Sequence, residues 1–123
     1  MVCLDEDYEM LALGQETELG EGGVNLSGGQ RSRIALARAL YNEADIYLFD
    51  DPLSALDPRV SMFIMDEAIV KYLKGKTRIL VTHQLRVLAK ADRIVYLDHG
   101  GVKFYGTFTE LKKSKIGIKE FIK

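Results

Sequence analysis

The sequence predicts an α/β fold built around a parallel sheet, and three observations support this. Residues 46–49 and 78–82 are short β-prone runs, and a helical stretch of more than ten residues separates them. A connection of that length is typical of a crossover between parallel strands. Near the end of the chain, His99-Gly100-Gly101 is a hairpin turn signal between two further short runs. We therefore expect parallel strands with flanking helices, followed by one antiparallel hairpin.

The first half of the chain is predicted to contain one well-defined helix. Residues 1–10 could form one or two helical turns, and residues 14–23 are acidic and glycine-rich, which indicates a surface loop. Residues 25–41 begin with turn-forming residues and continue as a helical body at 31–40. Apolar side chains cover a wide face of that body, so we expect most of it to be buried.

The second half alternates between predicted helices and strands. Asp57-Pro58 is a favourable helix start, since proline fits the first helical position, and Gly75 ends that helix. Residues 46–49 match a buried strand that ends in Asp50-Asp51-Pro52. The remaining predictions are strands at 78–82, 93–97 and 102–105, and helical turns at 84–90, 109–113 and 118–122.

Composition limits the classes of function. The chain has 123 residues, of which 47% are hydrophobic and 28% charged, enough for one ordinary domain with a core. Charged residues interrupt every apolar run and no leader-like segment opens the chain, so we expect neither a membrane span nor a secretory signal. The lone Cys3 excludes an internal disulfide and a cysteine zinc site. A net charge of −1 argues against nucleic acid as a partner.

The small net charge hides an asymmetry along the chain. No Lys or Arg precedes Arg31, whereas that stretch holds seven acidic residues: Asp5, Glu6, Asp7, Glu9, Glu16, Glu18 and Glu21. From Lys103 onward, six lysines face only two glutamates. We interpret both stretches as solvated surfaces rather than docking sites.

The first candidate site is Leu26-Ser27-Gly28-Gly29-Gln30, at the start of the predicted helix. Glycines leave backbone N–H groups uncovered, and a helix N-terminus gives them a partial positive charge, so this start could hold a phosphate. Ser27 is also a favourable N-cap residue, and an ordinary capped helix after a loop explains the pattern equally well.

The second candidate site is the pair Asp50 and Asp51, which follows the strand 46–49. Ligands of α/β proteins bind at the carboxyl ends of parallel strands. Asp50 could hold Mg²⁺, and Asp51 could orient an attacking water. Alternatively, the two acids simply begin a turn before Pro52.

The third candidate is His83, which follows the predicted strand 78–82. An imidazole in this place can reach a γ-phosphate or a nucleophilic water near neutral pH. A lone histidine is otherwise a surface or hydrogen-bonded structural residue.

The order of these motifs resembles the second half of the nucleotide-binding domain of ATP-binding-cassette (ABC) proteins, over nearly the whole chain. Leu26 to Gln30 resembles the signature motif and residues 46–50 the Walker B strand. Ser54-Ala-Leu-Asp57 resembles the D-loop, and His83 the switch histidine. The resemblance implies a P-loop NTPase-type sheet, with residues 1–42 in the signature and helical region and residues 43–123 carrying the other motifs and the C-terminal hairpin.

The resemblance also implies roles and ligands. Asp51 and His83 would be catalytic and Asp50 would bind Mg²⁺. ATP would be bound by the signature and D-loop residues Leu26, Ser27, Gly28, Gly29, Gln30, Ser54 and Asp57. In the family, the signature closes over ATP bound to a second nucleotide-binding domain in a head-to-tail sandwich. Partners would therefore be that second domain and the transmembrane domains, at the cytoplasmic face of a membrane.

Finer features narrow the resemblance. Thr17-Glu-Leu-Gly-Glu-Gly-Gly23 resembles the stretch before the signature in ABC exporters. Phe49-Asp-Asp-Pro-Leu-Ser-Ala-Leu-Asp57 resembles the first nucleotide-binding domain of subfamily C, the multidrug-resistance-protein group. Phe104-Tyr-Gly-Thr-Phe-Thr-Glu-Leu111 resembles the cystic fibrosis conductance regulator group of the same subfamily. Asp51 departs from the glutamate usual in active members, which predicts slow hydrolysis at this domain's own site. Asp50-Asp51-Pro52 and His83 favour a transporter. The alternatives are a soluble ABC ATPase or a channel-type regulatory domain gated by ATP.

The 123 residues contain no phosphate-cradling Walker A motif, Gly-x-x-x-x-Gly-Lys-Ser/Thr. Gly75-Lys76-Thr77 lies between a helix and a strand, and Val70 stands where the first glycine would be needed. We therefore expect the fold to be incomplete and the isolated chain to be inactive as an ATPase. A sheet that lacks its Walker A strand would have unpaired edges, which predicts self-association or pairing with the other half of the domain.

Overall fold

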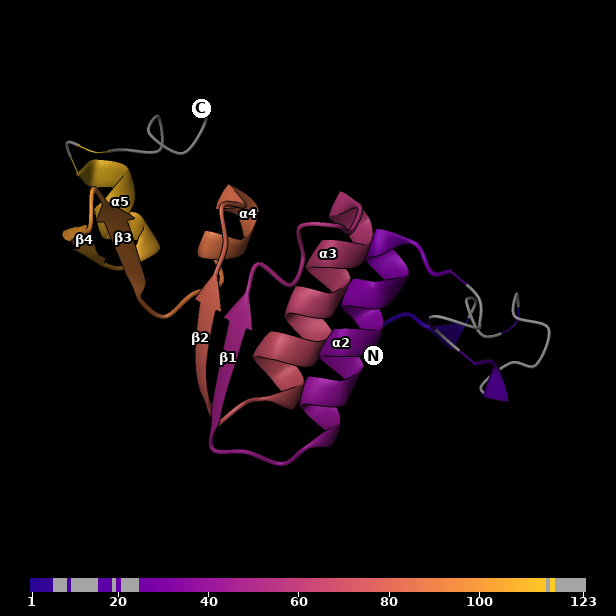
Figure 1. Ribbon diagram of the computed structural model, residues 1–123. Helices are drawn as coiled ribbons and strands as arrows, with labels where there is room; N and C mark the ends of the chain where they lie inside the picture. The colour runs from indigo at the N-terminus through magenta and orange to yellow at the C-terminus, as the bar shows by residue number, and fades with distance from the viewer. Residues whose placement is uncertain (6–8, 10–15, 19, 21–24, 115, 117–123) are drawn as a thin grey trace. The chain divides into compact units, whose positions relative to one another are not determined.

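The computed structural model describes residues 1–5, 9, 16–18, 20, 25–114 and 116 (Figure 1). These residues belong to two compact units, the first ending at Thr82 and the second beginning at His83. Each unit has its own two-stranded sheet. The helical turn expected at 118–122, part of the segment 1–10 and most of the loop expected at 14–23 lie outside the described residues.

The first unit has the alternating order that the sequence predicts. Its elements are α2 (Gly28–Tyr41), β1 (Ile46–Asp50), α3 (Pro58–Ile64), η2 (Met65–Tyr72) and β2 (Thr77–Val81). β1 and β2 pair in parallel, with Ile46 opposite Thr77 and Asp50 opposite Val81. The predicted crossover is therefore confirmed. The helix that makes it changes at Met65 from α-helical to π-helical geometry, which no sequence signal had indicated.

One face of the β1–β2 sheet packs against the crossover helix. Tyr47 and Phe49 are buried on this face, with their rings stacked 6.2 Å apart between centroids. Arg78 lies on the same face, because it pairs with Tyr47. Its guanidinium Nη1 donates hydrogen bonds to the carbonyl oxygens of Ile69 (2.8 Å) and Val70 (3.1 Å) in η2. These bonds satisfy carbonyls in the last turn of the helix and join it to the sheet.

The opposite face of the same sheet is apolar and open to solvent in the described structure. Ile46, Leu48, Ile79 and Val81 are exposed by between 55% and 73%. The expectation of a buried strand at 46–49 is therefore wrong for this face. β1 instead alternates between exposed and buried residues, as a strand does when only one face of its sheet is packed.

The expectation that most of α2 is buried is also wrong. Only Leu36 and Leu40 are fully buried in this helix, and Tyr41 is 89% exposed. Leu36 and Leu40 are four residues apart and so lie on one narrow stripe. The rest of the wide apolar face does not take part in this packing.

The second unit consists of α4 (Leu85–Leu88), β3 (Ile94–Asp98), β4 (Gly101–Gly106) and α5 (Phe108–Lys113). β3 and β4 pair antiparallel, as predicted. Both residues of the hairpin turn have positive φ, 48° for His99 and 74° for Gly100, which is the conformation that a two-residue turn of this kind requires. Val87, Ile94 and Leu111 form the buried core of this unit.

Within the described residues, each of the four strands pairs with one neighbour, β1 with β2 and β3 with β4. In the same part of the chain, no helix has the length and apolar character needed to cross a bilayer.

Candidate nucleotide site

The first element of the site is the start of α2, which a reciprocal capping box holds in place. Ser27 is the N-cap residue, and its Oγ accepts a hydrogen bond from the Gln30 backbone N–H (3.1 Å). The Gln30 side-chain Oε1 accepts in turn from the Ser27 N–H (2.8 Å). The structure therefore gives Ser27 the capping function that the sequence offered as one interpretation, and Gln30 completes the capping box. Leu26, directly before the cap, is half-buried.

The charge at this helix start is unusual for a purely structural cap. The first turn of α2 contains no acidic residue, and the exposed Arg31 lies in it. The partial positive charge of a helix N-terminus favours a negative charge beside it. The capping box thus fixes the helix start without neutralising it, and an anion such as a phosphate would complement it.

The second element is the turn that follows β1, and Asp51 is its most constrained residue. Asp51 has φ of 45°, in the left-handed region that Asp tolerates better than most residues. Its N–H donates to the Val81 carbonyl oxygen (2.9 Å), which extends the parallel pairing one residue past β1. One of its carboxylate oxygens, Oδ1, is buried. Asp50, one residue earlier, is the exposed last residue of β1.

Hydrogen bonds within the turn hold its remaining residues. The Ser54 hydroxyl donates to the Asp51 carbonyl oxygen (2.9 Å), and the Ser54 N–H reaches the same oxygen (3.3 Å). Asp57 ends the turn and caps α3, because its Oδ1 accepts from the N–H groups of Arg59 (3.0 Å) and Val60 (3.1 Å). Ser54 and Asp57, predicted as nucleotide-binding residues, thus make structural contacts inside their own chain.

The structure brings these two elements together at the glycines. A Cβ placed on Gly28 would lie 3.8 Å from the Ala55 Cβ, and one on Gly29 would lie 3.2 Å from the Ala55 carbonyl oxygen. The signature-like segment and the turn after Asp51 therefore touch, although more than twenty residues separate them in the sequence. Spacing alone gave no sign of this contact.

His83 is the predicted site residue that the structure does not join to the others. It is exposed and is the first residue of the second unit, so its position relative to Asp51 is not defined.

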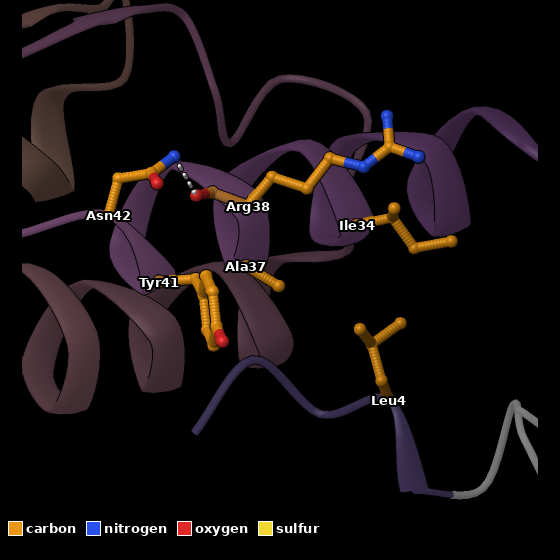
Figure 2. Close-up of a pocket in the computed structure, with 6 residues that line it drawn as sticks. All are labelled: Leu4, Ile34, Ala37, Arg38, Tyr41 and Asn42. Atoms are coloured by element: carbon orange, nitrogen blue, oxygen red, sulfur yellow. Dashed lines mark hydrogen bonds between the residues drawn. The ribbon is translucent and has the colours of Figure 1, made fainter.

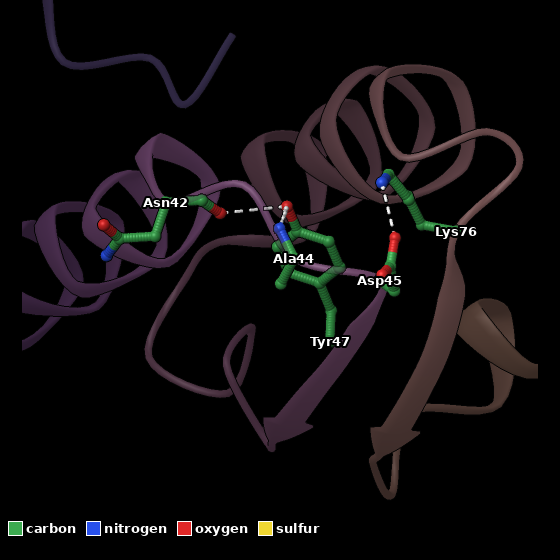
Figure 3. A network of polar contacts seen from close by, with 5 residues as sticks. All are labelled: Asn42, Ala44, Asp45, Tyr47 and Lys76. Atoms are coloured by element: carbon green, nitrogen blue, oxygen red, sulfur yellow. Dashed lines mark hydrogen bonds and ion pairs between the residues drawn. The ribbon is translucent and has the colours of Figure 1, made fainter.

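The Gly75-Lys76-Thr77 sequence has no phosphate-binding geometry and instead begins β2. Lys76 forms an ion pair with Asp45, with 3.0 Å between Nζ and Oδ1 (Figure 3). This hydrogen bond and charge raise the pKa of Lys76 above its ordinary value. The Thr77 N–H also donates to the Asp45 carbonyl oxygen (3.0 Å). The segment therefore joins the beginnings of the two parallel strands.

A second contact that the sequence analysis missed lies in the same network. The Tyr47 hydroxyl donates to the Asn42 carbonyl oxygen (3.0 Å) and accepts from the Ala44 N–H (3.2 Å), as Figure 3 shows. These bonds fix the loop that connects α2 to β1. The opposite charges of Asp45 and Lys76, each just before a strand, were the one signal in the sequence for this network.

One hollow in the first unit is a shallow apolar groove along α2. Its volume is about 490 Å³. Figure 2 shows the side chains that line it: Leu4, Ile34, Ala37, Arg38, Tyr41 and Asn42. The groove contains none of the predicted site residues.

The fit of Mg²⁺ can be judged from the available donor groups. In the described part of the chain, no three His, Cys, Asp or Glu side chains form a cluster able to hold a metal. Mg²⁺ usually takes one or two carboxylates together with substrate phosphates and water. The exposed carboxylate of Asp50 at the strand end suits that mode of binding and does not suit an all-protein cage.

The fold combines a capped helix start with an acidic turn at the end of a parallel strand, and this α/β arrangement is consistent with part of an ABC domain. A family model described as "ABC transporter" matches residues 4–54. The chain belongs to the ABC transporter family, and the similar proteins given below are of its C-family, multidrug-resistance type.

Three relatives illustrate the similarity. "ABC transporter C family member 2" of Dictyostelium discoideum is 49% identical over 121 residues, which are 98% of this chain and 9% of that protein. "Multidrug resistance protein" of Leishmania tarentolae is 52% identical over 105 residues, 85% of this chain and 7% of its own length. "Oligomycin resistance ATP-dependent permease YOR1" of Saccharomyces cerevisiae is 52% identical over 112 residues, 90% of this chain and 8% of its own length. The chain thus spans less than a tenth of these relatives.

Proposed function

We propose that this chain is the C-terminal part of the first nucleotide-binding domain of a multidrug-resistance-type ABC transporter. In that setting it takes part in binding and hydrolysing ATP to power export across a membrane. Residues 1–42 supply the signature region, and residues 43–123 supply Walker B, the D-loop, the switch histidine and the C-terminal hairpin. The observation that carries the proposal is the contact of the α2 start with the turn after Asp51, at Gly28 and Gly29.

The two sides of this contact serve different ATP molecules in the proposal. The start of α2 faces ATP held by a second nucleotide-binding domain. There Ser27 contributes its hydroxyl, Gly28 and Gly29 contribute uncovered N–H groups, and the helix contributes its partial positive charge. Leu26 and Gln30 hold this start in place, and Ser54 and Asp57 belong to the adjoining D-loop. The absence of an acid from the first turn supports this role, because a carboxylate there would repel the phosphates.

The domain's own ATP lies at the carboxyl end of β1 in the proposal. Asp50 holds Mg²⁺, which when bound neutralises charge on the phosphates and orients them. Asp51 orients the attacking water, and His83 reaches the γ-phosphate. The Asp51 carboxylate is one methylene shorter than that of glutamate. A misplacement of about 1 Å can cost on the order of a hundredfold in rate. Hydrolysis at this site is therefore slow, and the isolated chain, without a Walker A segment, is inactive.

The partners in this proposal are a second nucleotide-binding domain, arranged head to tail, and the transmembrane domains of the same transporter. The chain works at the cytoplasmic face of a membrane. The exposed apolar face of Ile46, Leu48, Ile79 and Val81 supports self-association of the isolated chain, since an uncovered sheet face of this kind favours contact with other surfaces.

A second candidate is a channel-type regulatory domain, in which ATP gates a pore and hydrolysis is unimportant. The short carboxylate at position 51 favours it, because such a domain has no need of fast hydrolysis. A soluble ABC ATPase is the remaining alternative, and the C-family names of the relatives favour a transporter over it.

The test uses the full-length protein in membrane vesicles, with ATPase and transport measured together. Ser27→Arg places a large cation in the signature and should reduce ATPase more than Asp51→Asn does, because the partner's site is the faster one. We expect at least about a tenfold difference between the two variants. Equal losses would contradict the division of roles between the sites. ATP-dependent channel opening without transport would favour the second candidate.

A further inference from the structure

We propose that Gly29 is a positioning residue for Asp51, acting inside its own chain through the turn Ala55–Ser54. The inference rests on the proposed function and adds a role for Gly29 besides presenting an N–H group to the partner's ATP. In this role, the missing Cβ of Gly29 lets the turn close against the start of α2.

The contact at Gly29 leaves little room for a side chain. A Cβ there would lie 3.2 Å from the Ala55 carbonyl oxygen and 3.6 Å from Leu56 Cδ2. The first of these separations is tight, and the neighbouring atom belongs to the backbone, which yields less readily than the end of a flexible side chain. Gly28 is different, because its Cβ would meet only the Ala55 Cβ, at an ordinary 3.8 Å.

The Ala55 carbonyl has little freedom to move away. Leu53, two residues earlier, is only 1% exposed and anchors the turn in the core. The Leu56 N–H donates to the Leu53 carbonyl oxygen (3.3 Å), and Asp57 is fixed as the cap of α3. Displacing Ala55 therefore strains a segment that is held on both sides.

The same segment determines the backbone of Asp51. Ser54, adjacent to Ala55, donates its hydroxyl to the Asp51 carbonyl oxygen (2.9 Å). The Asp51 backbone has φ of 45°, a conformation that persists only where surrounding contacts impose it. Gly29, Ala55, Ser54 and Asp51 thus form one continuous series of contacts from the helix start to the backbone that carries the Asp51 carboxylate.

The first experiment measures the contact without any ATP. Hydrogen–deuterium exchange is followed in the peptide covering residues 51–56 of the nucleotide-free full-length protein. We expect Gly29→Ala to speed exchange about tenfold and the matched control Gly28→Ala about twofold or less. Both substitutions add the same methyl group at neighbouring positions in the first turn of α2, so the difference isolates the contact with Ala55. The α5 peptide reports whether each variant is folded.

The second experiment asks whether the contact acts through Ser54. Exchange in the peptide covering residues 51–56 is measured for Gly29→Ala, Ser54→Ala and the double variant, because ATPase would also report the contact of Gly29 with the partner's ATP. If both residues act through one link, exchange in the double variant is no more than about twofold faster than in the more severe single variant. Additive effects on exchange, or equal exchange in the Gly28→Ala and Gly29→Ala proteins, would overturn the inference. An unmodified protein without ATPase would instead contradict the proposed function, and the exchange comparison would still decide whether Gly29 holds the turn.

Discussion

The starts of α2 and α5 share one hydrogen-bond pattern but differ in charge. In α2, Ser27 and Gln30 cap each other reciprocally. In α5, Thr107 and Glu110 do the same, with the Thr107 N–H and hydroxyl donating to the Glu110 carboxylate (2.6 and 2.8 Å). The α5 start therefore contains a negative charge in its first turn, whereas the α2 start contains none.

The difference in charge indicates that the start of α5 is built for stability alone, whereas the start of α2 can also bind an anion. Glu110 complements the partial positive charge of its helix start, which is what stability alone favours. Gln30 makes an equivalent cap with a neutral group and leaves the α2 start electropositive. A glutamate at position 30 would stabilise the start of α2 more than Gln30 does. The proposed function, however, requires a neutral side chain at this position.

The largest effect is expected from exchanging the two capping groups. Gln30→Glu should preserve the α2 cap, because Glu110 makes the same bonds in α5, but should repel the partner's phosphates. We expect the ATPase of the full-length protein to fall about tenfold, with a raised KM for ATP. Glu110→Gln is the matched control and should leave ATPase unchanged. Unchanged ATPase in both variants would show that the neutral charge of the α2 start is not needed for function.

A smaller effect is expected from removing each cap. Thr107→Ala should speed amide exchange in the first turn of α5 about fivefold, since it removes the acceptor of the Glu110 N–H. Ser27→Ala should loosen the α2 start by a similar factor and also reduce ATPase. Exchange in the two helix starts and ATPase are measured on the same preparations. A loss of ATPase in the Thr107→Ala protein would show that α5 is not merely structural.

The smallest effect on the helix starts is expected from lowering the pH. The Thr107 N–H, and then its hydroxyl, hold the pKa of Glu110 below the ordinary value of 4.5. A lowered pKa means that this carboxylate contributes stability above about pH 4.5, and that the contribution is lost as pH falls through the lower, folded-state pKa. Gln30 does not titrate, so the α2 cap should persist over this range.

Amide exchange of the two helix starts, corrected for intrinsic exchange rates and compared between about pH 5.5 and pH 3, measures this difference. Selective loosening of α5 is the expected result. Parallel loosening of both helix starts would instead indicate general acid unfolding of the chain.

Much of the fold was predictable, because local signals dominate its elements. The parallel crossover followed from apolar runs separated by a helical stretch, and the β3–β4 hairpin followed from His99-Gly100-Gly101. Burial was less predictable, since it depends on what covers each face. Ile46 and Leu48 have the composition of core residues, yet they are exposed on a sheet face that nothing in the described structure covers. The π-helical geometry of η2 has no local signature in its sequence either.

The candidate site was predictable only as a set of residues. Motif order selected Ser27, Gly29 and Asp51, and their placement at a helix start and a strand end followed from the predicted elements. The contact of Gly29 with Ala55 could not be predicted, because it depends on the path of a turn far away in the sequence. The roles of Asp50, Asp51 and His83 toward ATP stay predictions.

The bonds from Arg78 to η2 have a mechanical consequence for the crossover helix. Arg78 fastens the last turn of this helix to the sheet, whereas its first turn begins at Asp57, directly after the turn that contains Ala55. The two ends of the segment Pro58 to Tyr72, roughly 20 Å apart, are therefore fixed to different parts of the first unit. Its last turn is bonded to the start of β2, and its first turn is capped at the end of the turn that follows Asp51.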